Sequence, residues 1–280
     1  KALQGTGDLD AAADEYRNAL EIDPDSVSIW CDLGKMLLQM NDNIGAENAF
    51  RMAVEKKPDY AEAYILLAQT LNVMKKHSEA AAVYEKAVGL APEREDLVIS
   101  LADTFLLNRN WAEARDTYVN AIKHHPQSVM LLMNYAFILQ RGDQFTEAAK
   151  QYRKILSIQP DYYDAQYNLA LSLYLSRELR QARIETEAYV RKVPSSADGH
   201  LLLGRIYKDY ERYDDALAEF RTVSKLAPND ASAHVLAGNL LQIIGDEQGA
   251  IAEFREALRL NPNDKIAKRN LKRLIGSADF

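Results

Sequence analysis

Apolar residues recur three and four positions apart along nearly the whole chain. This spacing places them on one face of an α-helix. Two early examples are the sets Trp30, Leu33, Leu37 and Tyr64, Leu67, Leu71. The same spacing returns a little later in Ala80, Tyr84 and Ala87. The pattern predicts short amphipathic helices that follow one another along the chain.

Prolines separate these helical segments at a constant interval. The eight prolines lie 34 residues apart, at Pro24, Pro58, Pro92, Pro126, Pro160, Pro194, Pro228 and Pro262. A proline cannot continue a helix, and it disfavours helical geometry in the residue before it. The Asp, Asn or Ser that often follows can cap the next helix. A fixed period of this length predicts one structural unit copied without insertions.

Each unit is taken to end two residues after its proline. This gives a partial unit at 1–26 with its second helix complete, seven full units at 27–60, 61–94, 95–128, 129–162, 163–196, 197–230 and 231–264, and a C-terminal capping helix and tail at 265–280. The eighth place of a unit is always Gly or Ala, and the twentieth is always Ala. Small residues let two helices approach closely, so each unit is predicted to be a helix hairpin that stacks on its neighbours.

The unit 163–196 departs from this pattern at two places. It has Thr186 at the twenty-fourth place, where the other units have Phe or Tyr, and Tyr189 at the twenty-seventh. These places share a helix face because they are three residues apart. We expect the Tyr189 side chain to fill the space left at Thr186. The alternative is an outward Tyr189 and a loosely packed unit.

The unit 27–60 resembles a tetratricopeptide repeat (TPR) in the residues Trp30, Leu33, Gly34, Leu37, Ala46, Phe50, Ala53 and Pro58. The resemblance extends over about residues 9–275. It implies an all-α fold, an α-solenoid of stacked helix-turn-helix hairpins. Such a solenoid forms a right-handed superhelix, and the first helix of each unit lines its concave groove.

The two ends of the sequence suggest further expectations. Lys1 stands at the ninth place of a unit, so we expect the chain to come from a longer protein. The last helix, about residues 265–275, is predicted to cap the array by burying Ile266, Ala267, Leu271, Leu274 and Ile275. Its basic residues are expected to keep the outer face soluble, and contact with a membrane or an acidic partner is the alternative.

Composition and charge exclude several classes of protein. Charged residues make up 27% of the chain, and the longest nearly apolar run, 129–139, is shorter than the ~20 residues of a membrane span. The protein is therefore not expected to be membrane-embedded. No targeting signal is visible, and the cytoplasm is favoured over the periplasm. A net charge of -7 argues against nucleic acid as a partner. A single cysteine, Cys31, excludes an intrachain disulfide.

The sequence offers no catalytic or cofactor motif. No glycine-rich phosphate loop or nucleophile motif is present, and the carboxylates are scattered over helix faces. His200 and His234 occupy the fourth place of consecutive units, which we interpret as a packing position rather than a metal site. We therefore expect neither enzymatic activity nor a bound metal or cofactor.

The resemblance implies that six places of each first helix, the second, fifth, sixth, ninth, twelfth and thirteenth, face the groove. The fifth place is never basic, which argues against a clamp for a carboxylate terminus. Asn134 and Asn168 at the sixth place resemble two rungs of an asparagine ladder that binds peptide backbone, with simple solvated amides as the alternative.

Two first helices carry no charge, in the stretches 129–140 and 165–176. They predict an apolar patch in the middle of the groove. The candidate partner-binding residues are Ile65, Ile99, Asp103, Leu106, Met133, Asn134, Phe137, Tyr167, Asn168, Leu171, Tyr174 and Arg205. Large exposed apolar patches mark binding sites for peptides or helices. The alternative is that the curvature of the superhelix buries these side chains.

These observations favour a protein–protein interaction scaffold whose groove binds a peptide or helical segment of a partner. Self-association is left open as a second kind of partnership. The alternative function is a substrate-recruiting adaptor region of a larger polypeptide with a catalytic or transport domain, such as a glycosyltransferase or a polysaccharide-export protein. An RNA-binding helical repeat is disfavoured, because it would need a basic groove.

Overall fold

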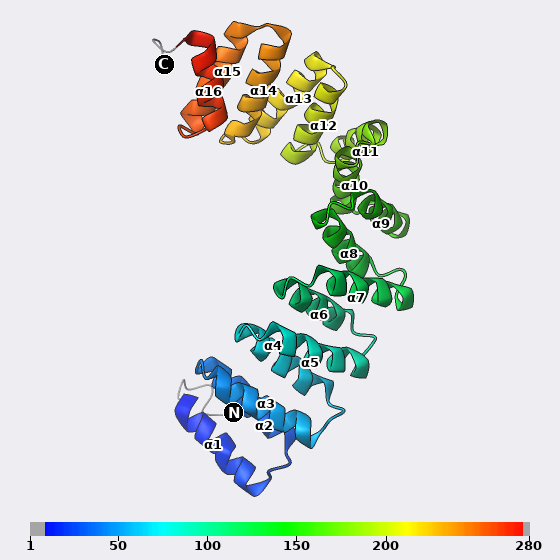
Figure 1. Cartoon of the computed structure of the whole chain (residues 1–280), viewed down its shortest axis with the longest axis vertical. Coiled ribbons are helices and arrows are strands. Elements are labelled where there is room, and N and C mark those ends of the chain that lie inside the picture. Colours follow the sequence, from blue (N-terminus) through cyan, green and yellow to red (C-terminus); the bar gives the residue numbers. More distant parts are fainter. Residues whose placement is uncertain (1–8, 277–280) are drawn as a thin grey trace. The chain divides into compact units, whose positions relative to one another are not determined.

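The computed structural model describes residues 9–276, and over this range every regular element is an α-helix. The all-α prediction is confirmed. The helices, labelled in Figure 1, are α1 (Leu9–Ile22), α2 (Val27–Gln39), α3 (Asn43–Lys56), α4 (Ala61–Val73), α5 (His77–Leu90), α6 (Glu95–Leu107), α7 (Trp111–His124), α8 (Val129–Arg141), α9 (Phe145–Ile158), α10 (Tyr163–Leu175), α11 (Leu179–Lys192), α12 (Ala197–Asp209), α13 (Tyr213–Leu226), α14 (Ala231–Ile244), α15 (Glu247–Leu260) and α16 (Lys265–Ile275).

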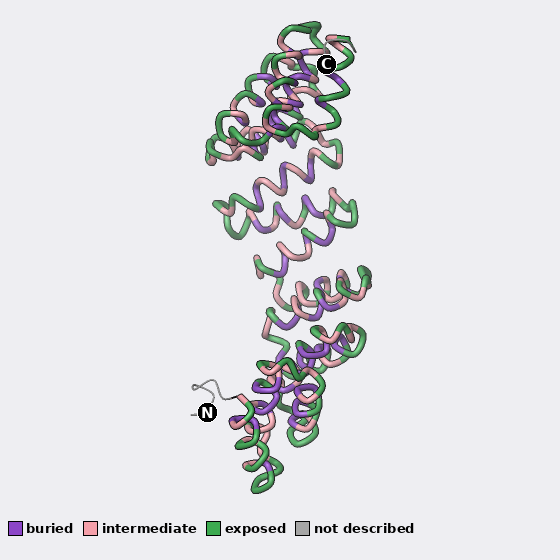
Figure 2. Tube along the Cα trace, turned by 90° about the vertical axis from the view of Figure 1, so that its left-hand side faces the viewer, coloured by how far each residue is buried: buried purple, intermediate pink, exposed green. Residues whose placement is uncertain are grey.

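Each 34-residue repeat contains one even-numbered first helix and one odd-numbered second helix, from α2 and α3 to α14 and α15. The repeats form two compact units that divide between Tyr135 and Ala136, inside α8. Within the first unit, successive helices from α1 to α7 pack against one another, and within the second those from α9 to α16 do. Buried and exposed stretches alternate along the helices (Figure 2). No helix in the described range is both long and apolar enough to cross a membrane.

A left-handed residue ends every first helix from α2 to α14. It stands at the fifteenth place of the repeat, with positive φ at Asn41, Lys75, Arg109, Asp143, Arg177, Glu211 and Gly245. A residue in this conformation stops the helix and turns the chain toward the second helix. Gly245, Asn41 and Asp143 are residue types that adopt this conformation readily, whereas the other four positions hold residues for which it costs conformational energy.

The fourth place of a repeat ties its first helix to the turn before it. In the first unit, the Trp30 indole N–H donates to the carbonyl of Pro24 at 2.8 Å, and the Tyr64 hydroxyl donates to the carbonyl of Pro58 at 3.1 Å. In the second unit, Nε2 of His200 makes the same contact with the Pro194 carbonyl, also at 3.1 Å. The fourth place is therefore a hydrogen-bonding position as well as a packing position.

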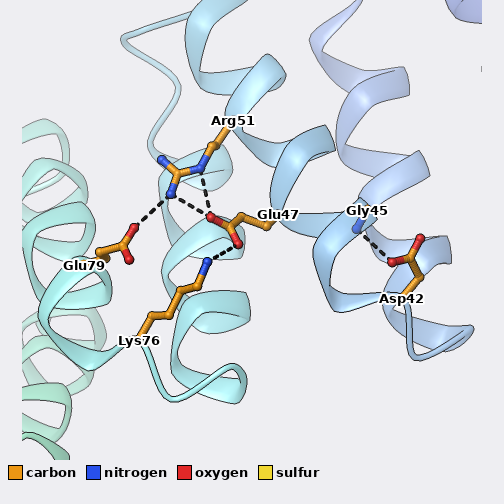
Figure 3. Close-up of polar contacts among 6 residues, drawn as sticks. All are labelled: Asp42, Gly45, Glu47, Arg51, Lys76 and Glu79. Atoms are coloured by element: carbon orange, nitrogen blue, oxygen red, sulfur yellow. Dashed lines mark hydrogen bonds and ion pairs between the residues drawn. The ribbon is translucent and has the colours of Figure 1, made fainter.

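A charged network joins second helices α3 and α5 in the first unit (Figure 3). Glu47 is 7% exposed and accepts hydrogen bonds from Arg51 at 2.7 Å and from Lys76 at 2.8 Å. Arg51 also binds Glu79 of α5 at 3.0 Å. Burial by itself would raise the pKa of Glu47, but the hydrogen bonds from Lys76 and Arg51 lower it below its usual value.

Neighbouring first helices are joined by partly buried hydrogen bonds between an amide and a hydroxyl. The Asn72 amide donates to the Thr104 hydroxyl at 2.7 Å in the first unit, and the Gln140 amide donates to the Ser172 hydroxyl at 2.8 Å in the second. Both hydroxyl residues are fully buried, and each hydroxyl also bonds a carbonyl of its own helix. These bonds satisfy polar groups inside an otherwise apolar contact.

The C-terminal helix α16 packs against α15, but its buried face differs from the predicted one. Ile266, which was expected to be buried, is 47% exposed, whereas Asn270 is 8% exposed and donates to the Asn239 side chain at 2.6 Å. The buried stripe runs through Ala267, Asn270 and Leu271, at helical spacing. Ile266 lies one residue off this stripe, so the prediction of its burial was wrong.

Candidate functional site

We use the name first-helix face for the side chains at the six groove places of the first helices. These are the second, fifth, sixth, ninth, twelfth and thirteenth places. In the first unit, its residues differ widely in exposure. Ile65 is only 5% exposed and packs in a cluster with Tyr84 and Leu101. Ile99 and Leu106 are half-buried, and Asp103 is exposed. Ile65 therefore serves the core and offers little surface to a partner.

Asp103 lies close to two buried tyrosines of the neighbouring second helices. Its charge raises the pKa of Tyr84 and Tyr118, in addition to the larger effect of their burial. Partial desolvation of the Asp103 carboxyl raises its own pKa above the usual value. The carboxylate thus borders the packed core, although the residue as a whole is exposed.

Two exposed aliphatic residues in the first unit were not among the predicted site residues. Val73 is 65% exposed and Leu107 is 59% exposed, both at the thirteenth place of their repeats. This place was assigned to the groove, but none of the candidate residues stands at it. An apolar residue repeated at the thirteenth place was the signal that could have found them.

The two asparagines at the sixth place, one in each unit, bind their own helices. The Asn134 amide donates to the Met130 carbonyl at 2.9 Å, and the Asn168 amide donates to the Asp164 carbonyl at 2.8 Å. Both residues are half-buried, as is Met133. A partner backbone would have to replace these local bonds or use the side-chain oxygens as acceptors.

In the second unit, the first-helix face is aromatic and partly open. Phe137 is 55% exposed, and Tyr167, Leu171 and Tyr174 of α10 are half-buried. The Tyr167 ring packs against the ring of Tyr189, with their centroids 5.5 Å apart. Burial raises the pKa of the Tyr167 hydroxyl, so this residue presents a neutral ring to the surface.

Charged residues of α12 border these aromatic residues. The Tyr174 hydroxyl donates to Asp209 at 3.0 Å, and burial, followed by this bond, raises the pKa of Tyr174. Arg205 is exposed and its charge acts on both Tyr167 and Tyr174. Within residues 9–276 it forms neither a hydrogen bond nor an ion pair, so its guanidinium can take an anionic partner group.

The residues that could carry chemistry are engaged in structural contacts. His200 and His234 each hold a glutamate of the following helix through Nδ1, Glu219 at 2.5 Å and Glu253 at 2.7 Å. Burial raises the pKa of the Cys31 thiol to about 11, which disfavours the reactive thiolate. Over the described range, no three His, Cys, Asp or Glu residues converge to hold a metal.

Comparison with protein-family models finds tetratricopeptide repeats along nearly the whole chain. A model described as "TPR repeat" matches residues 5–41, and one described as "Tetratricopeptide repeat" matches residues 31–95, 99–162, 138–197 and 201–265. No curated protein matches the chain significantly.

Among solved structures, the chain is similar to the C-terminal part of a TPR repeat-containing protein from Cytophaga hutchinsonii, at 17% identity and a TM-score of 0.67, over 85% of this chain and 98% of that one. It is also similar to a tetratricopeptide repeat protein from Parabacteroides merdae, at 16% identity and a TM-score of 0.56, over 89% and 98%. MamA from Desulfovibrio magneticus matches at 19% identity and a TM-score of 0.56, over 61% and 96%. At these identities, the similarity supports the fold alone. Since the family models cover most of its length, the chain belongs to the tetratricopeptide repeat family.

Proposed function

We propose that the chain is a protein-interaction scaffold whose first-helix face binds a peptide or helical segment of a partner protein. Tetratricopeptide repeats typically act as non-catalytic scaffolds. The observation that carries the proposal is Phe137, a large aromatic residue that is 55% exposed on a first helix with charge only at its end. An aromatic ring held open on a regular scaffold is typical of an interface anchor.

The second unit supplies both apolar and polar contacts for such a segment. Leu171 and the rings of Tyr167 and Tyr174 are half-buried, so a partner can complete their burial at little cost in side-chain entropy. Arg205 at the border can pair with an acidic residue of the partner. A segment with spaced apolar residues and a nearby carboxylate would match this combination.

In the first unit, Val73 and Leu107 supply exposed aliphatic surface on α4 and α6. Each alone would be an ordinary surface residue, but both occupy the same place in consecutive repeats. We propose that they contribute to partner binding together with the half-buried Ile99 and Leu106. Ile65 takes no part, because its side chain is already covered.

The test is a selection of amphipathic peptides that bind the full chain, followed by affinity measurements on variants. Phe137→Glu should weaken the selected peptides at least about tenfold, since one anchor residue can contribute 2 kcal/mol or more. Arg205→Glu should weaken peptides that contain an acidic residue more than those that do not. Helical content and melting temperature should stay nearly unchanged, because both side chains are exposed.

Ile184→Glu is the matched control. Ile184 is 48% exposed but lies on the second helix α11, so the same change in charge should leave peptide affinity unaltered. If Ile184→Glu weakens binding as much as Phe137→Glu does, the first-helix face is not the site. If the best ligand proves to be the chain itself, as measured by light scattering, the partner is a second copy.

A further inference from the structure

A cavity of about 690 Å³ opens in the first unit, on the side of the second helices. Residues of α5, the turn after it, α6 and α7 line the cavity, and its apolar wall includes Val88, Val98, Leu101 and Ala121. The volume lies in the range of small-ligand sites. None of the lining residues belongs to the first-helix face, so the cavity is separate from the candidate site above.

The fourth place of this repeat holds a small residue, Val98, which lines the cavity. In the two preceding repeats, the same place holds Trp30 and Tyr64, whose polar atoms bind the proline carbonyl of the turn before. Val98 has neither a ring nor a donor. Pro92 lines the cavity, and its carbonyl receives no hydrogen bond from any residue that the structure describes.

The equivalent crevice between α1 and α3 shows what a ring does there. That crevice also contains a cavity, but its volume is smaller, about 470 Å³, and Trp30 is part of its wall. Its lining does not include Pro24, whose carbonyl is occupied by the Trp30 indole. The ring therefore fills the proline end of the crevice, which stays open beside Val98.

A second residue at the same cavity is unexplained by folding. Gly89 lies near the end of α5, and helices disfavour glycine. Its φ is not positive, and a β-carbon added to it would meet no atom within 4 Å, so neither conformation nor packing requires glycine here. The preceding repeats have Glu21 and Glu55 at this place. Gly89 keeps long side chains away from the opening.

We propose that this cavity binds the side chain of a tryptophan or tyrosine from a partner protein, with its N–H or O–H donating to the Pro92 carbonyl. The inserted ring would occupy the space that Trp30 and Tyr64 fill in their own repeats. The proposed hydrogen bond from the ring to the proline carbonyl is thus the one that Trp30 and Tyr64 already make within this chain. The site goes beyond the proposed function, because it would bind on the second-helix side.

The test uses the full chain and side-chain analogues, followed by NMR of the methyl groups of Val98, Leu101 and Ala121. 3-Methylindole and p-cresol should shift these signals in a saturable way. Toluene, which has the same ring as p-cresol but no donor, should bind about three- to tenfold more weakly, the value of one hydrogen bond.

Two variants and one control separate binding from folding. Val98→Tyr places the residue of the preceding repeat in the cavity and should abolish binding. Gly89→Glu restores the residue found at Glu55 and should weaken binding without disturbing the fold, since it points into open space. Val73→Tyr makes the same kind of change on the first-helix face and should leave binding unaltered.

A capped peptide with a central tryptophan tests the source of the ring. It should bind at least as tightly as 3-methylindole, with the same methyl shifts. If only the free ring enters, the cavity takes a small molecule and the assignment to a partner protein is overturned. If toluene binds as well as p-cresol, or if Val98→Tyr leaves binding intact, the proposed site is wrong.

Discussion

In this chain, the two helices of a repeat contact each other through one of two residue pairs, which we call the two solutions. Three of them pair a glycine at the eighth place with a phenylalanine at the twenty-fourth, namely Gly34 with Phe50, Gly204 with Phe220 and Gly238 with Phe254. Three others pair an alanine with a tyrosine, namely Ala68 with Tyr84, Ala102 with Tyr118 and Ala136 with Tyr152. No repeat mixes the two solutions.

Close approach explains the glycine–phenylalanine pairs. A β-carbon built on Gly34 would lie 2.4 Å from the Phe50 ring, and the corresponding distances are 2.5 Å at Gly204 and 2.7 Å at Gly238. Such distances are impossible, so the phenylalanine ring occupies the space of the missing methyl group. An alanine at this place takes that space for itself, and the ring of its repeat must lie elsewhere.

In the alanine–tyrosine repeats, the ring at the twenty-fourth place also carries a hydroxyl group. The Tyr152 hydroxyl donates to the Gln140 side chain at 2.8 Å. Tyr152 is buried, and a buried hydroxyl needs a partner. The comparison teaches that the residues at the eighth and twenty-fourth places vary together.

The repeat 163–196 follows neither solution. It keeps Ala170, but Thr186 replaces the aromatic residue and is fully buried, with its hydroxyl bonded to the Ala182 carbonyl. Tyr189, three residues later, is 9% exposed, which confirms that its side chain is buried. A β-carbon on Gly199 would lie 2.7 Å from the Tyr189 ring. A glycine–aromatic contact has thus moved to the next repeat boundary.

The largest effect is expected for Tyr189→Ala. Removing this buried ring should lower the free energy of unfolding by about 3–5 kcal/mol, as for other large aromatic deletions. Chemical denaturation followed by circular dichroism would measure it. Tyr210→Ala is the control, since Tyr210 is 39% exposed and its loss should cost only about 0.5 kcal/mol.

The double variant Thr186→Tyr with Tyr189→Ala tests whether the side chains at the two positions fill the same space. If they do, restoring the usual residues should recover most of the stability lost in Tyr189→Ala. A double variant as unstable as the single one would show that Tyr189 has a role of its own, through Tyr167 and Gly199.

The next effect is expected for Gly34→Ala, which mixes the two solutions. Overpacking against Phe50 costs about 1–3 kcal/mol, and the helix propensity of alanine returns about 1 kcal/mol, so a net loss of up to about 2 kcal/mol should follow. Gly89→Ala is the matched control, because it adds the same methyl group in open space and should stabilise the protein.

A double-mutant cycle with Phe50→Leu sharpens this test. The shorter leucine should remove the clash, so the two changes together should cost at least about 0.5 kcal/mol less than their sum. Strict additivity would mean that the ring of Phe50 is not what forbids a β-carbon at position 34.

Much of the fold could be predicted from the sequence, because its repeats carry the same signals at the same places. The prolines and the small residues at the eighth and twentieth places marked the helix hairpins. The burial of single side chains at the candidate site could not be predicted in the same way. Ile65 is covered while Phe137 is open, although both stand at places assigned to the groove.

The reason is that exposure depends on pairs of neighbouring repeats. At the fifth place, Cys31, Ile65 and Val235 are buried, whereas Ile99, Met133, Tyr167 and Leu201 are half-buried. The cavity beside Val98 is likewise lined by residues of two repeats, among them Gly89 of the preceding one. A sequence pattern within one repeat cannot show a space that residues of two repeats leave between them.

A smaller effect is expected for Tyr152→Phe, which gives an alanine repeat the ring of a glycine repeat. The change removes only the hydroxyl and leaves the Gln140 oxygen without its donor. The free energy of unfolding should fall by about 1 kcal/mol, near the lower end for an unsatisfied polar group, because Gln140 is half-buried. Tyr210→Phe, at an exposed ring, should change stability little. An equal loss of stability in both variants would mean that the hydrogen bond of the Tyr152 hydroxyl does not distinguish the two kinds of repeat.

The smallest effect on stability is expected at Asp103, whose carboxylate lies close to the buried Tyr84 and Tyr118. Asp103 stands at the ninth place of an alanine–tyrosine repeat, where the glycine–phenylalanine repeats have Lys35, Arg205 and Asn239. Desolvation raises the pKa of its carboxyl in the folded protein above the usual value of an aspartate. Folding therefore favours the protonated form, and this residue lowers stability as the pH rises from about 4 through the folded pKa.

Asp103→Asn removes this penalty. At neutral pH the variant should be slightly more stable than the parent chain, by no more than about 0.5 kcal/mol, because the residue is exposed and solvent screens its charge. The gain should shrink as the pH falls toward 4, where the parent carboxyl takes up a proton in the folded state. Asp116→Asn, an exposed carboxylate on α7 paired with Arg115, should show no such gain. Melting curves of both variants between pH 4 and pH 7 decide the matter, since a gain at Asp103 that stays constant over this range would place its origin in packing rather than in charge.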